Sequence, residues 1–386
     1  MRLHQIDALR GFALLGILIV NIFVFHAPYA HYSAFYSRFA GLESQILEGM
    51  IFLFSGKFVF IYSFLFGYSF ALQREKFDED RAFRDNWTRR MAVLAFFGIL
   101  HLVLLSFGDI LLPYALLGLT LPFLARWSSW RLVVVALVVN LIPVYEFVLR
   151  GVFEYPDIAA QPAETLENSI RINRDGNYAE VLSLRLRDYF SLRNEKLIVY
   201  MPKEFSLFLV GIIAARNGLA SKVNVPRATG FCLASLAATV GIFVYRTDLI
   251  AAFDYESSIR DRIALILIIH AAEFVHGMLY IVGFFLLWKL PAIRNALFCL
   301  TFTGRLSLTL YVMQSLICLI LFSGFDLYAR LTPSQLILAA IAIYVAQLVF
   351  ALQWLHHRQQ GPLESIWRRL SRRAQRRLPS GSEKSS

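Results

Sequence analysis

Long apolar runs recur along the whole chain, and short polar or charged stretches separate them. Runs of about 20 apolar residues are typical of helices that span a lipid bilayer. The pattern predicts ten spanning helices, centred near residues 11–27, 52–72, 89–106, 110–125, 131–149, 203–215, 228–245, 263–288, 301–322 and 335–355. The expected fold class is therefore an all-α, polytopic membrane protein.

Arginine and lysine are concentrated in four connecting segments. These are residues 73–90, 126–131, 216–227 and the segment that follows residue 357. With ten spans, all four lie on one side of the membrane, and the positive-inside rule assigns that side to the cytoplasm. Both termini are then expected in the cytoplasm. The loop 26–50 and the long segment 150–202 are expected to face outside.

The composition excludes an ordinary soluble protein. Hydrophobic residues make up 58% of the chain and charged residues 17%, against about 25% charged residues in soluble domains. The formal net charge of +11 is typical of nucleic-acid-binding proteins, but the basic residues lie in the loops and the tail. We therefore expect the lipid bilayer, and not nucleic acid, as the partner of this surface.

The domain organisation follows from the same pattern. Residues 1–356 are expected to form the transmembrane bundle, with residues 150–202 inserted as a partly helical cap outside the membrane. Gly361 and Pro362 interrupt the chain after the last span. Apolar residues at helical spacing with arginines between them then predict a cytoplasmic amphipathic helix over 357–378. Residues 379–386 are expected to form a disordered polar tail.

The first thirty residues combine an apolar helix with groups that are costly near lipid. Asp7 and Arg10 lie one turn apart on one helix face. Asn21 interrupts the apolar run, and His26 and His31 follow its end. Each group has a structural alternative, such as snorkelling for Arg10 or an interhelical hydrogen bond for Asn21. In the functional alternative Arg10 binds an anion, Asp7 orients it, and a histidine acts as a general base.

Further polar groups lie inside or beside later spans. Lys57 opens the run KFVFIYSFLFG, where it either snorkels or contacts a phosphate or carboxylate. His101 precedes Asp109 by about two helical turns, so both can point into one outward-opening cavity. Arg305 begins the ninth span and is followed by a polar face that must look into the bundle. That face consists of Ser307, Tyr311, Gln314 and Ser315.

One pattern in the eighth predicted span resembles a metal site. It comprises His270, Glu273 and His276, spaced H-x-x-E-x-x-H. Steps of three residues turn these side chains away from a common line, and a di-iron bundle needs a second such motif, which the sequence lacks. No metal is therefore expected, and a polar, water-lined helix face is the alternative. The sequence also lacks phosphate-loop, dinucleotide-binding and serine-hydrolase signatures.

Several runs resemble the YeiB-like bacterial membrane family, whose domain has no defined function. They occur in order over most of the chain: IDALRGFALLGILIVN, KFVFIYSFLFG, RRMAVLAFFGILHLVLLSFGDILLPYALLG, GRLSLTLYVMQSLI and GPLESIW. That family is similar to a superfamily of transmembrane acyltransferases, which includes the lysosomal heparan glucosaminide acetyltransferase and bacterial sugar O-acetyltransferases. The resemblance implies a multi-pass protein of the bacterial inner membrane.

The resemblance also implies transfer of an acyl group from cytoplasmic acyl-CoA, such as acetyl-CoA, to a saccharide. In the sugar O-acetyltransferases a functional histidine follows an arginine after ten residues; here Arg10 is in place, but Asn21 stands at the histidine position. The lysosomal enzyme looks closer. Its pattern of D-x-x-R-G, an asparagine and an active histidine falls on Asp7, Arg10, Gly11, Asn21 and His31.

On the donor side, this resemblance implies that the phosphates of acyl-CoA bind near Arg10, with Asp7 beside it. Arg305 and Lys57 are the further candidates for phosphate contacts. The donor is expected to enter from the cytoplasm, because Arg10 lies at the start of the first span. No metal takes part in this scheme.

On the acceptor side, His31 is expected to deprotonate an outward-facing hydroxyl or amine, with His101 as the alternative base. Asn21 would position the acyl carbonyl, and Asp109 would orient a histidine. The acceptor is expected to be a saccharide or a lipid-linked molecule. The sequence does not identify it, nor the acyl chain.

Two other classes of function stay open from the sequence. A transporter or exporter of a small polar or anionic solute would line its path with the polar faces of the third, eighth and ninth spans. A scaffold without chemistry would need Asp7, Arg10 and His101 only for stability. The oligomeric state is not determined by the sequence, and a homodimer is compatible with it.

Overall fold

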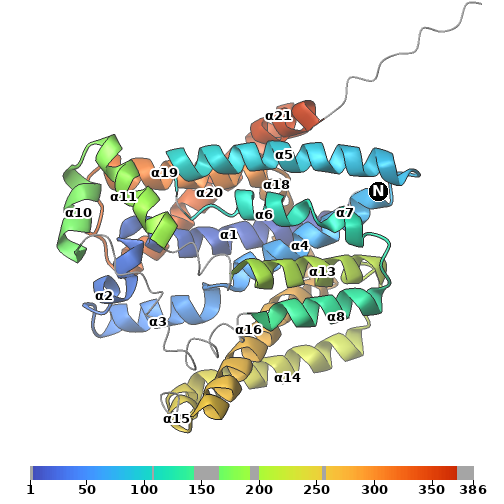
Figure 1. Ribbon diagram of the computed structural model, residues 1–386, viewed down its shortest axis with the longest axis horizontal. Helices are drawn as coiled ribbons and strands as arrows, with labels where there is room; N and C mark the ends of the chain where they lie inside the picture. The colour runs from blue at the N-terminus through green and yellow to red at the C-terminus, as the bar shows by residue number, and fades with distance from the viewer. Residues whose placement is uncertain (1–2, 107, 143–164, 192–199, 254–257, 372–386) are drawn as a thin grey trace, which may run out of the picture.

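The computed structural model describes residues 3–106, 108–142, 165–191, 200–253 and 258–371 (Figure 1). These residues form helices, turns and loops with no strand among them, which confirms the predicted all-α class. In chain order the helices are α1 (His4–His26), η1 (Tyr29–His31), α2 (Tyr32–Tyr36), α3 (Leu42–Phe54), α4 (Lys57–Arg74), α5 (Asp80–Leu104), α6 (Leu111–Gly118), α7 (Leu121–Leu124), α8 (Ser129–Asn140), α10 (Leu166–Asp175), α11 (Tyr178–Ser191), α13 (Met201–Arg216), α14 (Val225–Val244), α15 (Arg246–Ala251), α16 (Ile259–Trp288), α17 (Pro291–Leu297), α18 (Leu300–Arg305), α19 (Ser307–Leu319), η3 (Ile320–Gly324), α20 (Pro333–His357) and α21 (Pro362–Ser371).

Seven helical stretches of the described chain are long and apolar enough to cross a membrane. They are α1, α3 with α4, α5, α14, α16, α19 with η3, and α20. Three further predicted spans occur as shorter helices: α8, α13, and the pair α6 and α7. Pro122 accounts for the division of that pair, because its ring would clash with the carbonyl of Gly118, the residue at which α6 ends.

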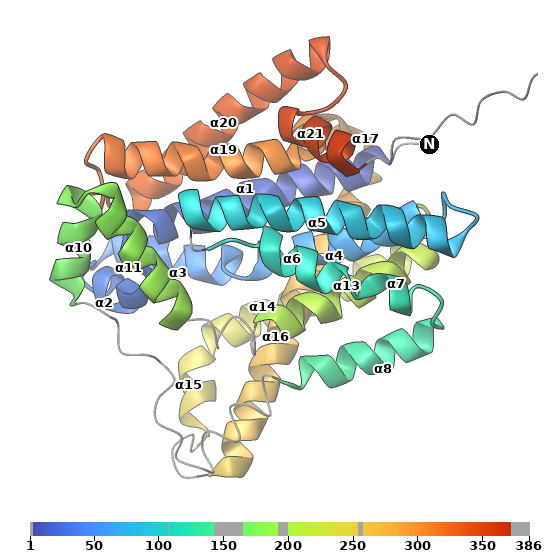
Figure 2. The same ribbon diagram turned by 45° about the horizontal axis from the view of Figure 1, so that its top comes forward.

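The first helix, α1, lies in the centre of the bundle (Figure 2). In the most apolar 18-residue stretch of α1, 61% of the residues are buried, a larger share than in the corresponding stretches of the other candidate spans. It packs most extensively against α18, where Gly11 leaves no room for a Cβ beside the Leu300 carbonyl. Gly304 of α18 approaches the backbone of Asp7 just as closely. Small residues of this kind let transmembrane helices pack at short range.

A second close helix pair consists of α4 and α13. A Cβ on Gly67 would collide with the carbonyl of Phe208, and a Cβ on Gly211 would collide with the carbonyl of Phe64. The two glycines therefore form a reciprocal contact between backbones. This contact fixes α4, which carries Ser63 and Ser69, against α13.

Two predicted spans are interrupted in the structure. The span predicted over 52–72 is interrupted between Phe54, where α3 ends, and Lys57, where α4 begins; between them Gly56 adopts a φ of +75°, which glycine reaches without steric cost. The span predicted over 301–322 is broken at Leu306, so that α18 and α19 are separate helices. The break exposes the first backbone N–H groups of α19, and a side chain from α21 accepts two of them.

The basic loops meet at one end of the bundle, which we call the basic end. Arg74 and Arg126 both contact Asp80 at the start of α5, and Arg216 donates to the carbonyl of Trp127 at 2.6 Å. The N-terminus lies at this end, and α10 and α11 lie at the opposite end, which we call the cap end (Figure 1). The grouping of the basic loops is the one that positive-inside topology requires.

The predicted domain boundaries are partly covered by the described residues. Of the predicted cap, 150–202, the structure describes 165–191 as α10 and α11, and 200–202 at the start of α13. The predicted basic helix, 357–378, appears as α21, whose Trp367 Nε1 donates to the carbonyl of Arg90 at 2.8 Å. This helix is thus docked on α5. Residues 372–378 and the predicted tail 379–386 lie outside the described residues.

Candidate functional site

The predicted site residues fall into three parts of the bundle. Asp7, Arg10 and Arg305 lie at the basic end; His101 and Asp109 lie in the interior; Asn21, His31 and Lys57 lie towards the cap end. Each part offers different chemistry, so the three are described in turn.

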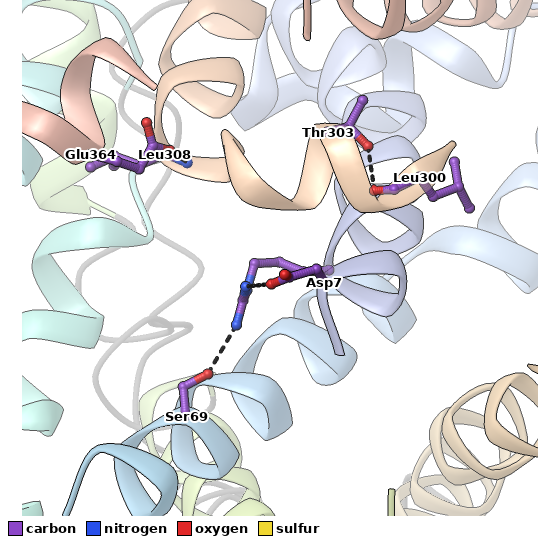
Figure 3. A network of polar contacts seen from close by, with 7 residues as sticks. Asp7, Ser69, Leu300, Thr303, Leu308 and Glu364 are labelled. Carbon is purple, nitrogen blue, oxygen red and sulfur yellow. Dashed lines mark hydrogen bonds and ion pairs between the residues drawn. The ribbon is translucent and has the colours of Figure 1, made fainter. Parts of the chain in front are cut away.

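At the basic end, Arg10 is held at two points. Its Nη1 lies 2.9 Å from Oδ1 of Asp7, and its Nη2 donates to Oγ of Ser69 on α4 at 3.0 Å (Figure 3). Asp7 is buried, with 8% of its surface exposed. A guanidinium has five N–H donors, so an arginine anchored by two of them can still bind an anion. The 2.9 Å contact shows that Asp7 and Arg10, which the sequence places on one helix face, form an ion pair.

Arg305 lies at the same end, whereas Lys57 does not. Nη2 of Arg305 donates to the carbonyl of Gln359, just before α21, at 3.1 Å. Lys57 begins α4, and Ser69, which contacts Arg10, follows it by twelve residues, or about 18 Å at the helical rise. Lys57 and Arg10 therefore lie at different levels of the bundle, and the structure brings Arg305, not Lys57, to the end that holds Arg10.

In the interior, His101 of α5 lies between a carboxylate and a hydroxyl. Its Nδ1 is 2.9 Å from Oδ1 of Asp109, and its Nε2 is 2.8 Å from Oγ of Ser315 on α19. The approach to Asp109 is bent away from ideal hydrogen-bond geometry. All three residues are buried, with 2–3% of their surfaces exposed. The order hydroxyl, imidazole, carboxylate is the one that makes a serine nucleophilic in acyl-transfer enzymes.

Local structure fixes the position of Asp109. The chain leaves α5 after Leu104, and Oδ2 of Asp109 accepts the backbone N–H of Leu112 at 2.7 Å, so the carboxylate caps the first turn of α6. Its other oxygen is directed at His101. This is the position from which Asp109 would orient a histidine, as expected from the sequence. Both residues are buried in the bundle, and neither is among the residues that line the cavity at the cap end.

His26 has a structural role that the sequence left open. It is fully buried, and its Nε2 accepts the backbone N–H of Leu331 at 2.9 Å. Its Nδ1 must then carry the proton, and it donates to Oη of Tyr36 at 3.1 Å, while the Tyr36 hydroxyl donates to the carbonyl of Phe23. Both ring nitrogens are used within the fold, so His26 ties the end of α1 to α2 and to the start of α20.

The other two cap-end candidates are more accessible. His31 is half-buried at the end of η1, five residues beyond α1. Asn21 is half-buried on α1, one turn before His26. Neither residue lies among those that line the cavity found at this end. The resemblance assigns Asp7 and Arg10 to the donor side and His31 to the acceptor side, and in the structure the first two lie at the basic end and His31 lies towards the cap end.

The cap end contains a cavity between the bundle and the cap. Its polar lining includes Ser106 after α5, Asn173 of α10, and Arg185 and Asp188 of α11, and Cys318 of α19 also lines it. Burial lowers the pKa of Arg185, whose Nη1 donates to the carbonyl of Leu105 at 3.4 Å. Cys318 follows Ser315 by three residues, so the cavity ends about one helical turn from the interior site.

The interior holds further polar groups that the sequence analysis did not select as site residues. Oγ of Ser63 lies 2.6 Å from Oη of Tyr114, and Glu204 of α13 is buried, with 8% exposed. Glu204 is an acid within the apolar run that forms α13, a signal that could have identified it. Ser315 was part of the predicted inward-facing polar face, and the burial of Tyr311, Gln314 and Ser315 confirms that face.

The histidines of α16 have separate partners. Nδ1 of His270 donates to the carbonyl of Ile266 at 2.9 Å, Glu273 pairs with Lys203 at 2.8 Å, and the His276 ring stacks on Tyr280. Within the described ranges, no group of three or more His, Cys, Asp or Glu residues is arranged to hold a metal ion. The H-x-x-E-x-x-H pattern therefore contributes polar contacts along one helix.

Comparison with known proteins agrees with the motifs. Residues 214–374 match the model of a family described as a protein of unknown function, DUF418. The chain is also similar to YeiB of Escherichia coli (strain K12), at 25% identity over 96% of each chain. These matches confirm the predicted resemblance to the YeiB-like family.

Two further relatives come from bacilli. The chain is 26% identical to YxaH of Bacillus subtilis (strain 168), over 95% of this chain and 93% of the relative. It is 28% identical to a 39.9 kDa protein encoded in the amylase 3′ region of Bacillus acidopullulyticus, over 96% of this chain and 94% of the relative. The similarity to all three relatives extends over almost the whole chain. Because each relative is described as uncharacterised, it assigns no reaction.

Proposed function

We propose that this polytopic membrane protein, similar along its whole length to YeiB, is an acyltransferase of the bacterial inner membrane. It would move an acyl group from cytoplasmic acyl-CoA to a hydroxyl or amine outside the membrane, with a saccharide or a lipid-linked molecule as acceptor. The observation that carries the proposal is the position of His101, held between Asp109 and Ser315 inside the bundle. An enclosed imidazole with a carboxylate behind it is suited to proton transfer.

The donor is assigned to the basic end because Arg10 lies there. Asp7 and Ser69 fix the direction of its guanidinium, and a fixed guanidinium recognises phosphate through paired N–H donors. Arg305 lies at the same end and supplies a second positive charge. Acyl-CoA is rich in phosphate, so its nucleotide part would bind here while the acyl end reaches into the bundle.

The acid–base role is assigned to His101 in preference to His31. General-base catalysis needs an imidazole whose orientation is fixed and whose second nitrogen is free to exchange a proton. The carboxylate of Asp109, 2.9 Å from Nδ1, would supply that fixation for His101. Asn21 stays a candidate for positioning the acyl carbonyl, because it lies on α1 between Arg10 and the cap end.

The test is acyl transfer by the purified protein in vesicles. Labelled acetyl-CoA is supplied on the side of the basic end, a panel of amino sugars, neutral sugars and lipid-linked sugars is supplied on the other side, and CoA release is measured with label transfer. We expect His101→Ala to abolish transfer and His31→Ala to retain most of it. Wild-type rates in both variants, or no CoA-dependent reaction with any acceptor, would overturn the proposal.

Transport is the competing outcome of the same preparation. If the protein moves a polar or anionic solute, flux should proceed without CoA, and acetyl-CoA should not raise the melting temperature. If it is an acyltransferase, acetyl-CoA should stabilise the fold, by a free energy that rises with the logarithm of the ratio of ligand concentration to Kd. A stabilisation that disappears in Arg10→Ala would locate the donor at the basic end.

A further inference from the structure

The hydroxyl of Ser315 lies at the position from which His101 would take a proton. Nδ1 of His101 faces Asp109, so Nε2 is the nitrogen available for proton exchange, and it lies 2.8 Å from Oγ of Ser315. The carbonyl of Tyr311, one turn earlier on α19, is a more distant acceptor for the Ser315 hydroxyl, at 3.5 Å. The shorter contact is therefore the one with the imidazole.

The contact between Ser315 and His101 bears on the sequence of chemical steps. For His101 to deprotonate an external acceptor directly, the acceptor hydroxyl would have to displace Ser315 from Nε2. Ser315 is only 2% exposed and is held on a packed helix. We therefore propose that Ser315 carries the acyl group as an ester between donor and acceptor, so that transfer proceeds by double displacement; this inference rests on the acyltransferase function proposed above.

The position of Ser315 along α19 suits a residue that carries the acyl group from donor to acceptor, a role that we call the relay. It lies eight residues, or about 12 Å, from Ser307 at the start of α19, near the basic end. Cys318, one turn further on, lines the cavity at the cap end. A covalent carrier at this level would let the donor react from one side and the acceptor from the other, without both substrates occupying the bundle together.

The two steps balance without another reactant. In the first, Oγ of Ser315 attacks the thioester carbonyl of acyl-CoA, its proton passes to Nε2 of His101, the C–S bond breaks, and the proton passes on to the leaving thiolate to give CoA. In the second, the esterified Oγ no longer donates a proton to Nε2, so His101 takes the proton of the acceptor hydroxyl or amine, which attacks the Ser315 ester. The C–Oγ bond breaks, and the proton returns to Ser315.

The donor half-reaction tests this without knowledge of the acceptor. The reconstituted protein is incubated with labelled acetyl-CoA alone, denatured in acid, digested and mapped by mass spectrometry, in parallel with Ser315→Ala, Ser315→Cys and Ser235→Ala. Ser235 is the matched control, a buried serine on α14 with 3% exposure. We expect one acetyl group on Ser315, released by alkaline hydroxylamine as an ester is, and a label reduced to background in Ser315→Ala.

The cysteine variant distinguishes loss of the nucleophile from misfolding of the protein. Ser315→Cys should fold, and it should take up the acetyl group as a thioester that neutral hydroxylamine releases faster than the wild-type ester. Melting temperatures of all variants are recorded with and without acetyl-CoA. A Ser315→Ala protein that still binds acetyl-CoA but takes no label supports the relay.

The outcomes separate the relay from the function itself. Acyl transfer to an acceptor at the wild-type rate by Ser315→Ala overturns the relay and leaves the acyltransferase intact. An acetyl group mapped to His101 or to another residue also overturns it. If the wild-type protein shows no CoA release, no label and no stabilisation by acetyl-CoA, both the acyltransferase function and the relay are wrong.

Discussion

Glu364 of α21 holds the first turn of α19 through Thr309. Its Oε2 accepts the Thr309 hydroxyl at 2.5 Å, and its Oε1 accepts the Thr309 backbone N–H at 3.1 Å. The same Oε1 accepts the backbone N–H of Leu308 at 2.7 Å. A helix that begins inside the bundle thus receives its N-terminal cap from a residue more than fifty positions later in the chain.

Removing this cap should destabilise the bundle. Glu364→Ala leaves the N–H groups of Leu308 and Thr309 without their acceptor, at a cost of about 1–3 kcal/mol. We expect a lower melting temperature and faster hydrogen exchange at the start of α19. Glu75→Gln, at an exposed position after α4, is the control and should melt as the wild type does. An unchanged exchange rate at Leu308 in Glu364→Ala would contradict the capping role.

The same carboxylate should make stability depend on pH. Burial raises the pKa of Glu364, and the hydrogen bonds from Thr309 and Leu308 offset only part of that rise. Because the folded state binds this proton more tightly than the unfolded state, its contribution is full below the ordinary value of 4.5 and is lost as pH rises through the raised pKa. Melting temperatures measured across this window should therefore fall with pH in the wild type and fall less in Glu364→Gln.

The reciprocal glycines of α4 and α13 predict a strong packing effect. Gly67→Ala or Gly211→Ala would place a Cβ against a backbone carbonyl of the other helix, which should force the pair apart and cost about 1–3 kcal/mol or more. Gly241→Ala on α14 is the matched control, because no atom lies within 4 Å of its added Cβ. That control should be neutral or slightly stabilising, since alanine favours helix. Equal melting temperatures for Gly67→Ala and Gly241→Ala would contradict the close contact.

The sequence predicted the features that depend on local pattern. Apolar runs identified the helical spans, and the spacing of three residues identified the ion pair of Asp7 and Arg10. The contact between His101 and Asp109 was also within reach, because both residues lie close together in the chain on either side of a tight turn. Period and spacing are properties of a short segment, and a single sequence contains them.

The features that the sequence did not reveal depend on contacts between distant segments. Ser315 completes the His101 site from 214 positions away, and Glu364 allows α19 to begin at an internal break. The separation of Lys57 from the basic end has the same origin. A lysine at the end of an apolar run shows that it lies near an interface, but which end of the bundle that is depends on the packing of α4 against α1.

Arg10 variants should weaken donor binding more than turnover. Arg10→Lys keeps the charge but loses the paired contacts to Asp7 and Ser69, so the KM for acetyl-CoA should rise on the order of tenfold while kcat changes little. Arg294→Lys, an exposed residue of α17, is the control for a change of side-chain type. A fall in kcat with an unchanged KM would remove Arg10 from the donor site.

Asp109→Asn should give the opposite pattern. An asparagine oxygen can still accept the N–H of Leu112, so α6 keeps its cap, and the free energy of unfolding should change by no more than about 1 kcal/mol. The charge that faces Nδ1 of His101 is lost, however, and with it the preference for the protonated imidazole in the transition state. We expect kcat to fall about a hundredfold or more.

The KM for acetyl-CoA should meanwhile remain that of the wild type, because Asp109 lies in the interior and Arg10 at the basic end. This split separates positioning of the base from a general loss of structure, which would lower donor affinity and melting temperature together. If Asp109→Asn retains the wild-type kcat, the carboxylate serves only to cap α6, and the base must be sought elsewhere, first at His31.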